Sequence, residues 1–387
     1  MINIKILRKE GKYLKNMLIN FSRDSDSFII KWLRSLDKII LILLILWIML
    51  GLIFVTTTTL DFASTKLYNN PKTLVNKYYL FIFVSLFIIL FFSIFNESFY
   101  QEFAKFFLIF SLSLLLLTLI FGVEVKGSKR WINLFFFNFQ PIELVKPSLI
   151  IFLAGIFSSE KSFIAKFSFS GLVVFITVFT LLLQPDYTQA LIVLLVWFTI
   201  VFVSGISLVN IILSLGIVTT IMISILFFFK ENFSYIFLRF EKWISSSDIS
   251  YQSEKSIDAI KHGGFFGQGI GEGILKEKIP EAHTDYVLAS ISEEYGIIAI
   301  IFILIIVFTL FIRVFAICQN EISNFKKYCL ISLSTLTLLQ IFINVGVTIN
   351  LIPSTGMTFS FLSYGGSSIL TSAFIMGIIL ALTKNKI

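Results

Sequence analysis

The sequence predicts an all-α, polytopic membrane protein with about ten transmembrane helices. Two observations carry this prediction. The chain is 57% hydrophobic and only 14% charged, with a mean hydropathy of +0.93, whereas an ordinary soluble protein has about a quarter charged residues. The apolar residues also gather in runs of roughly 20, the length that spans a bilayer as a helix. The composition therefore excludes an ordinary soluble domain.

Ten apolar runs follow one another along the chain. They cover residues 38–57, 77–95, 103–122, 143–158, 166–183, 187–205, 207–229, 287–314, 327–349 and 361–382. The fourth to sixth runs are short or closely spaced, so their ends are the least defined. The longest polar interval, Lys230 to Asp285, is predicted to be one long outer loop between the seventh and eighth helices.

The chain divides into a basic segment, residues 1–37, and a transmembrane domain, residues 38–383. The basic segment mixes Lys and Arg with apolar residues, which predicts either a weakly amphipathic surface segment or a disordered tail. The first apolar run is long enough to be a span rather than the core of a signal peptide. Because cytoplasmic loops hold an excess of Lys and Arg, both termini are expected in the cytoplasm and the long loop outside.

The charge and the cysteine count exclude two other classes of protein. The net charge of +8 could suggest nucleic acid, but the basic bias of cytoplasmic loops accounts for it, and no nucleic-acid partner is expected. The two cysteines are too few for a disulfide framework or a zinc cluster. Thiol-based cofactor chemistry is therefore not expected.

A polar motif, PEAHTDY at Pro280 to Tyr286, stands at the mouth of the predicted eighth helix. It contains Glu281, His283 and Asp285. Polar residues at such a place either cap the helix or carry chemistry. Capping by Thr284 or Asp285 is the structural alternative, and function depends on which of the two applies.

Other polar residues lie inside or beside the apolar runs. Glu143 and Lys146 are three residues apart and share one helix face, which predicts a structural ion pair or, as for any intramembrane charge, a functional site. Asp186 follows Gln184 and Pro185, and a tight outer turn with Asp186 capping the sixth helix explains this triplet. Glu293 lies with Glu294 about two turns into the eighth helix, where a buried hydrogen-bonded role and a substrate role are both open.

Two segments are rich in small residues. Six glycines between Gly263 and Gly273 indicate a backbone that turns sharply or approaches a ligand, although a flexible loop has the same pattern. GQGIGEG is not a dinucleotide fingerprint, because no βα unit surrounds it. The last outer segment, Asn350 to Ser368, ends in SYGGSS. Such a run either packs helices closely or lines a polar cavity.

Taken together, these segments resemble the SEDS family of peptidoglycan polymerases, which contains FtsW and RodA. The similarity extends over nearly the whole chain and rests on the order of several motifs. They are GxKRW at Gly127 to Trp131, QPxEL with a following Lys at Gln140 to Lys146, QPD at Gln184 to Asp186, the glycine-rich loop, PEAHTD, and SYGGSS. Within the family the chain is most similar to FtsW of α-proteobacterial type, through GEG, PEAHTDY with SEEYG, and TGMT.

The resemblance implies glycosyl transfer at the outer face of the bacterial inner membrane during cell division. Family members polymerise lipid II into β-1,4 glycan and release undecaprenyl pyrophosphate. By this resemblance Asp285 is the catalytic residue, a base for the attacking sugar hydroxyl. The residues expected to contact substrate are Arg130, Trp131, Glu143, Lys146, Asp186, Glu281, His283, Ser363, Tyr364, Gly365, Gly366 and Ser367.

The resemblance also implies a cofactor and partners. A divalent cation, Mg²⁺ or Mn²⁺, is expected, with ligands that the sequence does not identify. The expected partners are a class B penicillin-binding protein that cross-links the new strand, and other division proteins. Three alternatives stay open: a lipid II flippase, an elongation polymerase of RodA type, and a structural scaffold of the division machinery. The motif residues cluster at the outer ends of helices, which favours the enzyme over a transporter.

Overall fold

The computed structural model describes most of the chain. The described residues are 28–62, 72–125, 128–134, 137–205 and 251–384, with the isolated positions 216 and 220. The predicted helix at 207–229 and the first part of the long loop, 230–250, therefore lie outside the described residues. So does most of the basic segment, 1–27.

Nine helices of the described part correspond to nine of the ten predicted spans. They are α3 (Lys38–Phe62), α4 (Lys72–Ile94), α5 (Glu97–Phe121), α6 (Pro141–Ser158), α7 (Phe163–Leu183), α8 (Tyr187–Val203), α12 (Val287–Gln319), α13 (Asn324–Thr348) and α14 (Gly366–Leu382). Seven are long and apolar enough to cross a membrane, and α8 and α14 are shorter apolar helices. The chain is a multi-pass helical protein, and the total of ten spans stays a prediction.

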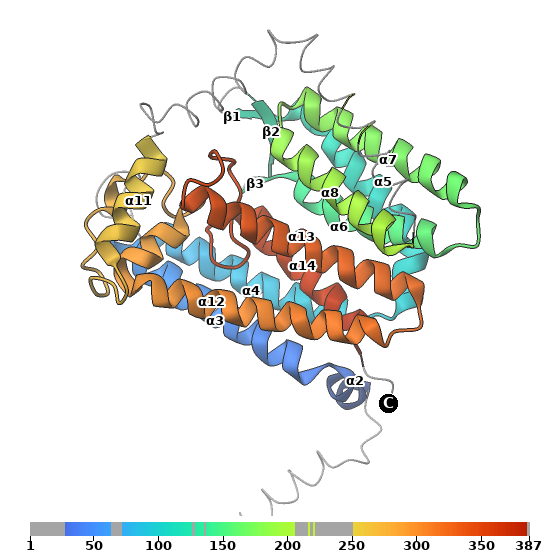
Figure 1. Ribbon diagram of the computed structural model, residues 1–387, viewed down its shortest axis with the longest axis horizontal. Helices are drawn as coiled ribbons and strands as arrows, with labels where there is room; N and C mark the ends of the chain where they lie inside the picture. The colour runs from blue at the N-terminus through green and yellow to red at the C-terminus, as the bar shows by residue number, and fades with distance from the viewer. Residues whose placement is uncertain are drawn as a thin grey trace, which may run out of the picture.

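The remaining elements are short and lie at the two ends of the bundle. α2 (Phe28–Ser35) precedes α3, and the described part of the long loop contains α11 (Tyr251–Gly263) and the 3-10 turn η1 (Lys276–Lys278). Figure 1 shows α11 at one end of the bundle and α2 near the C-terminus at the other. These are called the α11 end and the α2 end below.

A small antiparallel sheet departs from the all-α prediction. Its strands are β1 (Val123–Val125), β2 (Ser128–Asn133) and β3 (Asn138–Phe139), in the order β1-β2-β3. β2 pairs Trp131 with Val123 and Ile132 with Phe139. The strands are too short to stand out from the apolar helices in sequence, because their alternation extends over only a few residues. The sheet joins α5 to α6 at the α11 end (Figure 1).

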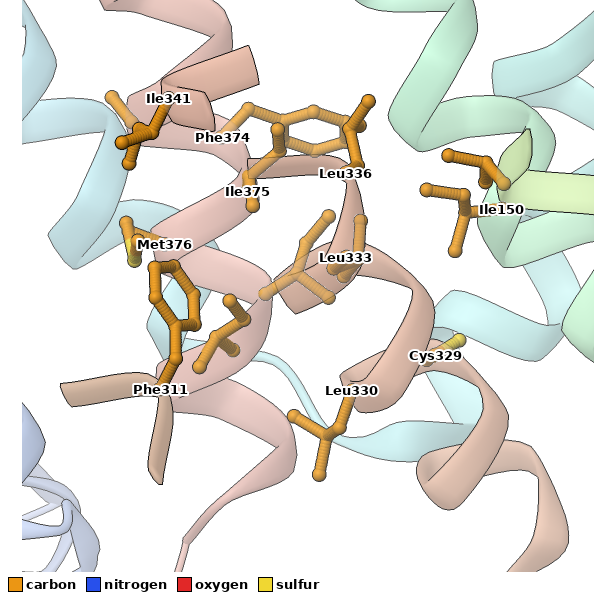
Figure 2. Packing of buried hydrophobic residues seen from close by; sticks show 14 of the residues in the cluster. Ile150, Phe311, Cys329, Leu330, Leu333, Leu336, Ile341, Phe374, Ile375 and Met376 are labelled. Carbon is orange, nitrogen blue, oxygen red and sulfur yellow. The ribbon is translucent and has the colours of Figure 1, made fainter. Parts of the chain in front are cut away.

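The core of the bundle forms where α6, α12, α13 and α14 meet. Figure 2 shows Leu333 and Leu336 of α13 beside Phe374 and Ile375 of α14, with Phe311 of α12 close by. All five side chains are buried. α14 also packs against α4, α12 against α3, and α5 against α6. The side chains that remain exposed on the outer helices are largely apolar, as a lipid-facing surface requires.

Two helix boundaries bear on the site. The predicted last helix, 361–382, begins instead at Gly366, because residues before it form a turn in which Ser363 accepts the backbone amide of Phe359 at 2.8 Å. α12 is interrupted at Gly296, whose φ of 78° and ψ of 172° are not helical. Both irregularities lie at the α11 end, around Asp285.

Candidate active site

The PEAHTDY segment forms a compact turn directly before α12. The amides of Thr284 and Asp285 donate to the carbonyl of Glu281 at 3.0 and 3.2 Å. Glu281 itself has a left-handed φ of 60°, an uncommon conformation for a residue other than glycine. The N-cap residue of α12 is Tyr286, and its own side chain makes no cap hydrogen bond. The Thr284 hydroxyl donates to the carbonyl of Glu281 at 3.1 Å, within the turn.

Asp285 is held from two other elements. The buried side-chain amide of Asn344, on α13, donates to the carbonyl of Asp285 at 3.0 Å and to that of Met357 at 2.6 Å. Gly356, in the loop between α13 and α14, lies close to the Asp285 carboxylate: a Cβ added to this glycine would lie 3.8 Å from Oδ2 of Asp285. The α13–α14 loop therefore passes beside a half-buried carboxylate whose backbone is fixed.

The SYGGSS motif braces the same turn from its other side. Ser363 donates through its hydroxyl to the carbonyl of Thr284 at 2.6 Å, and the amide of Tyr364 donates to the carbonyl of His283 at 2.8 Å. The rings of His283 and Tyr364 lie 6.0 Å apart. Burial lowers the pKa of His283 below its usual range, although the negative charge of Glu281 opposes the change. His283 is therefore a neutral imidazole at neutral pH.

The second half of SYGGSS packs helices. The Ser367 hydroxyl accepts the amide of Gln140 at 3.1 Å and donates to the carbonyl of Asn138 at 3.2 Å. A side chain at Gly366 would meet the ring of Phe81, and one at Gly365 would meet the Ser368 hydroxyl. The start of α14 thus lies directly against α4 and against the junction of β3 with α6.

Glu143 and Lys146 form the ion pair that their spacing predicts. Lys146 Nζ lies 2.7 Å from Glu143 Oε1, and both side chains are buried. Gln189 of α8 joins the pair: its carbonyl oxygen accepts from Lys146 at 2.9 Å and its amide donates to Glu143 at 3.0 Å. Gln340 of α13 donates to the other carboxylate oxygen at 3.5 Å. The buried charges are thus compensated by neighbours on two other helices.

Arg130 and Asp186 form a second charged pair near the membrane surface. Arg130 Nε on β2 lies 3.7 Å from Asp186 Oδ2 and donates to the carbonyl of Gln184 at 3.1 Å. Asp186 is the N-cap residue of α8, but its side chain makes no cap hydrogen bond there. It points instead to Arg130 and to the amide of Gln140, 3.5 Å away. Asp186 thus occupies the predicted N-cap position, where its carboxylate interacts with the backbone amide of Gln189 as well as with Arg130.

Burial raises the pKa of Asp186, and the nearby Arg130 only partly offsets the change. Trp131, next to Arg130 on β2, points to the opposite face of the strand by the pleat. Of the predicted substrate contacts, Trp131 and Gly366 are thus the two that lie apart from the polar groups.

The two polar groups are connected through Met357. Gln189 Nε2, in the Glu143 group, lies 3.7 Å from Met357 Sδ. The carbonyl of Met357 accepts from Asn344, which also holds Asp285. One continuous set of contacts therefore runs from the buried ion pair to the turn that carries Asp285. Sequence reasoning missed Gln189, Gln340 and Asn344, although each is a polar amide inside an otherwise apolar helix, a signal that marks buried polar contacts.

The glycine-rich loop is fixed rather than flexible. The amides of Gln268 and Gly269 donate to the carbonyls of Glu293 and Glu294 at 2.9 and 3.1 Å. The loop approaches so closely at Gly267 that a side chain there would overlap the carbonyl of Glu294. Gly263 and Gly267 lie so close to the backbone of α12 that neither position has room for a side chain. The prediction that this loop approaches a ligand stays a prediction.

Glu293 and Glu294 are fully buried and hydrogen-bonded. Glu293 accepts the amides of Leu275 and Lys276 at 2.7 and 2.6 Å, and His262 Nδ1 lies 3.0 Å from it. Glu294 pairs with Lys276, whose side chain is also fully buried. These contacts attach the end of the long loop to the helix that follows Asp285, and they favour the structural role for both carboxylates.

No metal cage is found within the described residues. Nowhere among them do three or more His, Cys, Asp or Glu side chains gather closely enough to hold an ion. Mg²⁺ in phosphate chemistry commonly takes one or two carboxylates and completes its shell with substrate oxygens. Asp285 and its half-exposed surroundings fit only that arrangement.

The overall match of this chain to known proteins settles its family. The model of the FtsW/RodA/SpoVE family of cell cycle proteins matches residues 37–387. The chain belongs to this family. The family's "Probable peptidoglycan glycosyltransferase FtsW" from Buchnera aphidicola subsp. Baizongia pistaciae is 30% identical over 84% of this chain and 87% of that protein.

Two further comparisons, with a second relative and with a solved structure, show how far the similarity extends. The protein of the same name from Caulobacter vibrioides is 31% identical over 68% of each chain, so the matches do not single out one bacterial type. A solved peptidoglycan synthase complex, described as coordinating polymerisation and crosslinking, contains a chain with a TM-score of 0.74 at 22% identity, covering 90% of this chain and 98% of that one. At that identity the structure shows a shared fold.

Proposed function

We propose that this chain is a peptidoglycan glycosyltransferase that polymerises lipid II during cell division. The observation that carries the proposal is the fixed turn at Asp285, a half-buried residue at the end of a membrane bundle: Asn344 holds the carbonyl of Asp285, and Ser363 holds that of Thr284. The FtsW-named relatives support the reaction class and favour division over elongation. A lipid-linked sugar would reach Asp285 from the membrane surface.

In the proposed reaction Asp285 accepts the proton of the acceptor sugar hydroxyl as that oxygen attacks the anomeric carbon of the donor. The new glycosidic C–O bond forms as the bond to the pyrophosphate oxygen breaks, and undecaprenyl pyrophosphate leaves. A single base with one displacement inverts the anomeric centre and yields a β-1,4 link. No second carboxylate of the glycosidase kind is needed.

Negative charge grows on the leaving pyrophosphate, and cations would stabilise it. Arg130 is the better candidate among the side chains, because it is 27% exposed whereas Lys146 is 2% exposed and already paired with Glu143. We therefore assign Arg130, with Asp186 beside it, to substrate contact. Glu143 and Lys146 hold the helices behind the turn. Glu281 and His283 lie in the same turn as Asp285, and Tyr364 is bonded to that turn through the carbonyl of His283.

A divalent cation, Mg²⁺ or Mn²⁺, is part of the proposal. When bound, it would add positive charge at the pyrophosphate, with Asp285 the nearest carboxylate that could share it and substrate oxygens as the other ligands. If so, a chelator stops polymerisation and added Mg²⁺ restores it. Undiminished synthesis in excess chelator would remove the cation from the proposal.

The location and partners follow from the same assignment. The α11 end faces outward from the inner membrane at the septum, with both termini in the cytoplasm, because lipid II is used outside. A class B penicillin-binding protein is the proposed partner, since the solved complex with this fold is described as coordinating polymerisation with crosslinking. Other division proteins would recruit the pair.

A flippase is the second candidate, and one observation favours it: the charged pair Glu143–Lys146 is buried inside the bundle. The pair is, however, fully compensated by Gln189 and Gln340 and linked to the Asp285 turn rather than to the α2 end. A transport path needs polar groups toward both faces. An elongation polymerase of RodA type would share the active site and differ in its partners.

The deciding experiment is polymerisation of purified lipid II by the purified chain with its transpeptidase partner and Mg²⁺. Asp285→Asn keeps the size of the side chain and removes its basicity, so glycan strands should be lost. Glu277→Gln is the matched control, because Glu277 is an exposed carboxylate in η1 at the same end. Wild-type rates from Asp285→Asn would refute the base, and equal loss from Glu277→Gln would point to a general effect of charge.

A further inference from the structure

The glycine-rich loop at the α11 end exposes several large apolar side chains. Phe265 and Phe266 are 70% and 81% exposed, and Ile270 and Ile274 of the same loop are 65% and 64% exposed. A single exposed apolar side chain needs no explanation, whereas a group of them marks an interaction surface. The loop therefore carries a surface that another molecule or the membrane covers.

The backbone around the two phenylalanines is fixed. The amide of Gly267 donates to the carbonyl of Gly263 at 2.8 Å and closes a turn around Phe265 and Phe266. Gly264 and Gly267 have φ of 58° and 81°, in the left-handed region that glycine adopts readily. The turn therefore presents both side chains on a backbone with defined hydrogen bonds.

The same turn is bonded to α12 directly after the kink in that helix. The amide of Ile297 donates to the carbonyl of Gly264 at 3.0 Å, and the amide of Ile298 donates to that of Phe265 at 3.4 Å. A side chain at Gly296 would overlap the carbonyl of Phe265. The turn therefore adjoins the first residues of the second part of α12.

From this point α12 has an exposed apolar side. Ile298, Ile301, Phe302 and Ile305 are exposed and follow one another at the spacing of one helix face. Figure 1 shows α12 along the lower side of the bundle, with α11 and the glycine-rich loop at one end of this helix. α12 is long and apolar enough to cross a membrane, so this side faces lipid. The turn is joined to the lipid-facing side of α12.

The length of α12 indicates how deep the turn lies. Arg313 of α12 pairs with Asp37 at the α2 end, and a charged pair on a membrane helix is favoured at the boundary of the hydrocarbon. From Arg313 back to Ile298 the helix rises about 23 Å, at 1.5 Å per residue. The hydrocarbon core of a bilayer is about 30 Å thick. Phe265, which is bonded to Ile298, therefore lies within reach of the far boundary of this core.

We propose that Phe265 and Phe266 insert into the membrane at the α11 end, at the boundary between lipid headgroups and acyl chains. Apolar side chains of an interfacial segment enter this boundary, and the burial of their surface favours the bound state. Lipid covers the two side chains rather than a second protein, because the turn is bonded to the lipid-facing side of α12. The proposal does not depend on the reaction assigned above.

Insertion of the two phenylalanines would set the depth of the turn that carries Asp285. The next residues of the loop are bound before the kink, where the amides of Gln268 and Gly269 donate to the carbonyls of Glu293 and Glu294. These glutamates follow Asp285 on the first part of α12. A loop held in the membrane would therefore keep this part of α12 at a defined distance from the membrane surface.

The test measures the depth of a nitroxide label by electron paramagnetic resonance, on the full chain in vesicles of phosphatidylcholine and phosphatidylglycerol. Cys318 and Cys329 are buried, so a label on Phe266→Cys reports on the loop. Dissolved oxygen should relax this label several-fold more than a water-soluble nickel chelate does, as for Ile305→Cys on the lipid-facing side. Glu277→Cys, at an exposed polar position of η1, is the control and should show the opposite order.

A second measurement asks whether the phenylalanines cause the insertion. A label on Ile270→Cys should also be in contact with lipid, and adding Phe265→Ser/Phe266→Ser should raise its relaxation by nickel several-fold. Phe106→Ser, an exposed position on the lipid-facing surface of α5, should leave the label on Ile270→Cys unchanged. Thermal unfolding checks that each labelled protein is folded.

Three results would overturn the proposal. The first is nickel relaxation above oxygen relaxation for the label on Phe266→Cys. The second is a label on Phe266→Cys shielded from both reagents, which is the result expected if a second copy of the chain or the segment between α8 and α11 covers the loop. The third is a folded Phe265→Ser/Phe266→Ser protein in which the label on Ile270→Cys keeps its depth.

Discussion

The side-chain amide of Asn344 donates to two backbone carbonyls at once, those of Asp285 and Met357. Asp285 and Met357 are more than 70 positions apart in the sequence, on either side of α13. A single buried side chain thus sets the distance between the turn that carries the proposed base and the loop that passes beside it. Asn344 is a positioning residue rather than a reacting one.

Replacing Asn344 by Ala should lower polymerisation more than it lowers stability. The two buried carbonyls would lose their donor, at a cost of about 2 kcal/mol, and a misplaced base would reduce kcat by at least about tenfold while KM changes little. Polymerisation kinetics and thermal unfolding measured on the same preparation check this. Thr335→Ala is the control, since Thr335 bonds only to the carbonyl of Ile331 on its own helix. A fall in stability with unchanged kcat would assign Asn344 to structure alone.

The buried pair Glu143–Lys146 should show strong coupling in a double-mutant cycle. Removing one partner leaves an uncompensated charge, so Glu143→Gln and Lys146→Met should each cost about 3–5 kcal/mol of unfolding free energy. The double variant should cost much less than the sum, because it leaves no charge unpaired. Denaturant unfolding in micelles gives the unfolding free energy of the wild type, the two single variants and the double variant. Additive costs would contradict the pairing.

The exposed pair of Lys255 with Asp258 provides the contrast for that cycle. Both side chains are reached by water, so solvent screens their attraction. Lys255→Ala should therefore leave the unfolding transition where it is. A large loss of stability in Lys255→Ala would mean that the coupling measured between Glu143 and Lys146 does not result from their burial.

Gly296→Ala should release the glycine-rich loop from α12. The φ of 78° disfavours a side chain, and a Cβ at this position would overlap the carbonyl of Phe265. We expect a loss of more than about 1 kcal/mol and faster proteolysis between α11 and η1. Gly155→Ala is the control, because Gly155 is helical and open space surrounds it. Unchanged proteolysis in a folded Gly296→Ala protein would show that the attachment of the glycine-rich loop to α12 does not depend on this glycine.

Stability should fall as pH is lowered through about 6.5 because of His283. Burial lowers the pKa of His283 in the folded state, so below about 6.5 the unfolded chain binds a proton that the folded chain does not. The unfolding free energy therefore decreases toward acid. His283→Gln should flatten the dependence of Tm on pH between 7.5 and 5.5. Glu281→Gln should steepen it, since the charge that opposes the shift is removed.

Asp186 should act in the opposite direction at lower pH. Burial raises its folded pKa above the usual 3.8 or so, so the folded state holds a proton where the unfolded state has lost one. The stability that Asp186 contributes by holding this proton is thus fully present below its unfolded-state pKa, and it is lost as the pH rises through its folded-state pKa. The two side chains are separable, because Asp186 lowers stability as the pH rises whereas His283 lowers it as the pH falls. Identical pH slopes for the wild type and His283→Gln would rule out the histidine as the source.

The sequence was sufficient for what depends on local pattern. Nine of the predicted helices are present among the described residues, because runs of apolar residues leave a membrane chain little choice but the helix. The Glu143–Lys146 pair was predictable because a spacing of three places both side chains on one face. The family was predictable because several motifs keep one order along the chain.

What could not be predicted depends on contacts between distant residues. No local sequence pattern indicates that Asn344 donates to the carbonyl of Asp285. The same holds for the hydrogen bonds that Gln189 and Gln340 donate to the Glu143 carboxylate. The pairing of the Asp186 carboxylate with Arg130, on β2, could not be predicted for the same reason. The glycine-rich loop also could not be told from a flexible one, since its partner carbonyls are on Glu293 and Glu294.

The interruption at Gly296 divides α12 into two bodies that need not move together. Residues 297–319 form the part that meets the lipid, and its tilt adjusts to the local thickness of the bilayer. Residues 287–295 follow Asp285 directly and are bound to the long loop through Glu293 and Glu294. Because the helix is broken at Gly296, a change in the tilt of residues 297–319 need not displace the turn that carries Asp285.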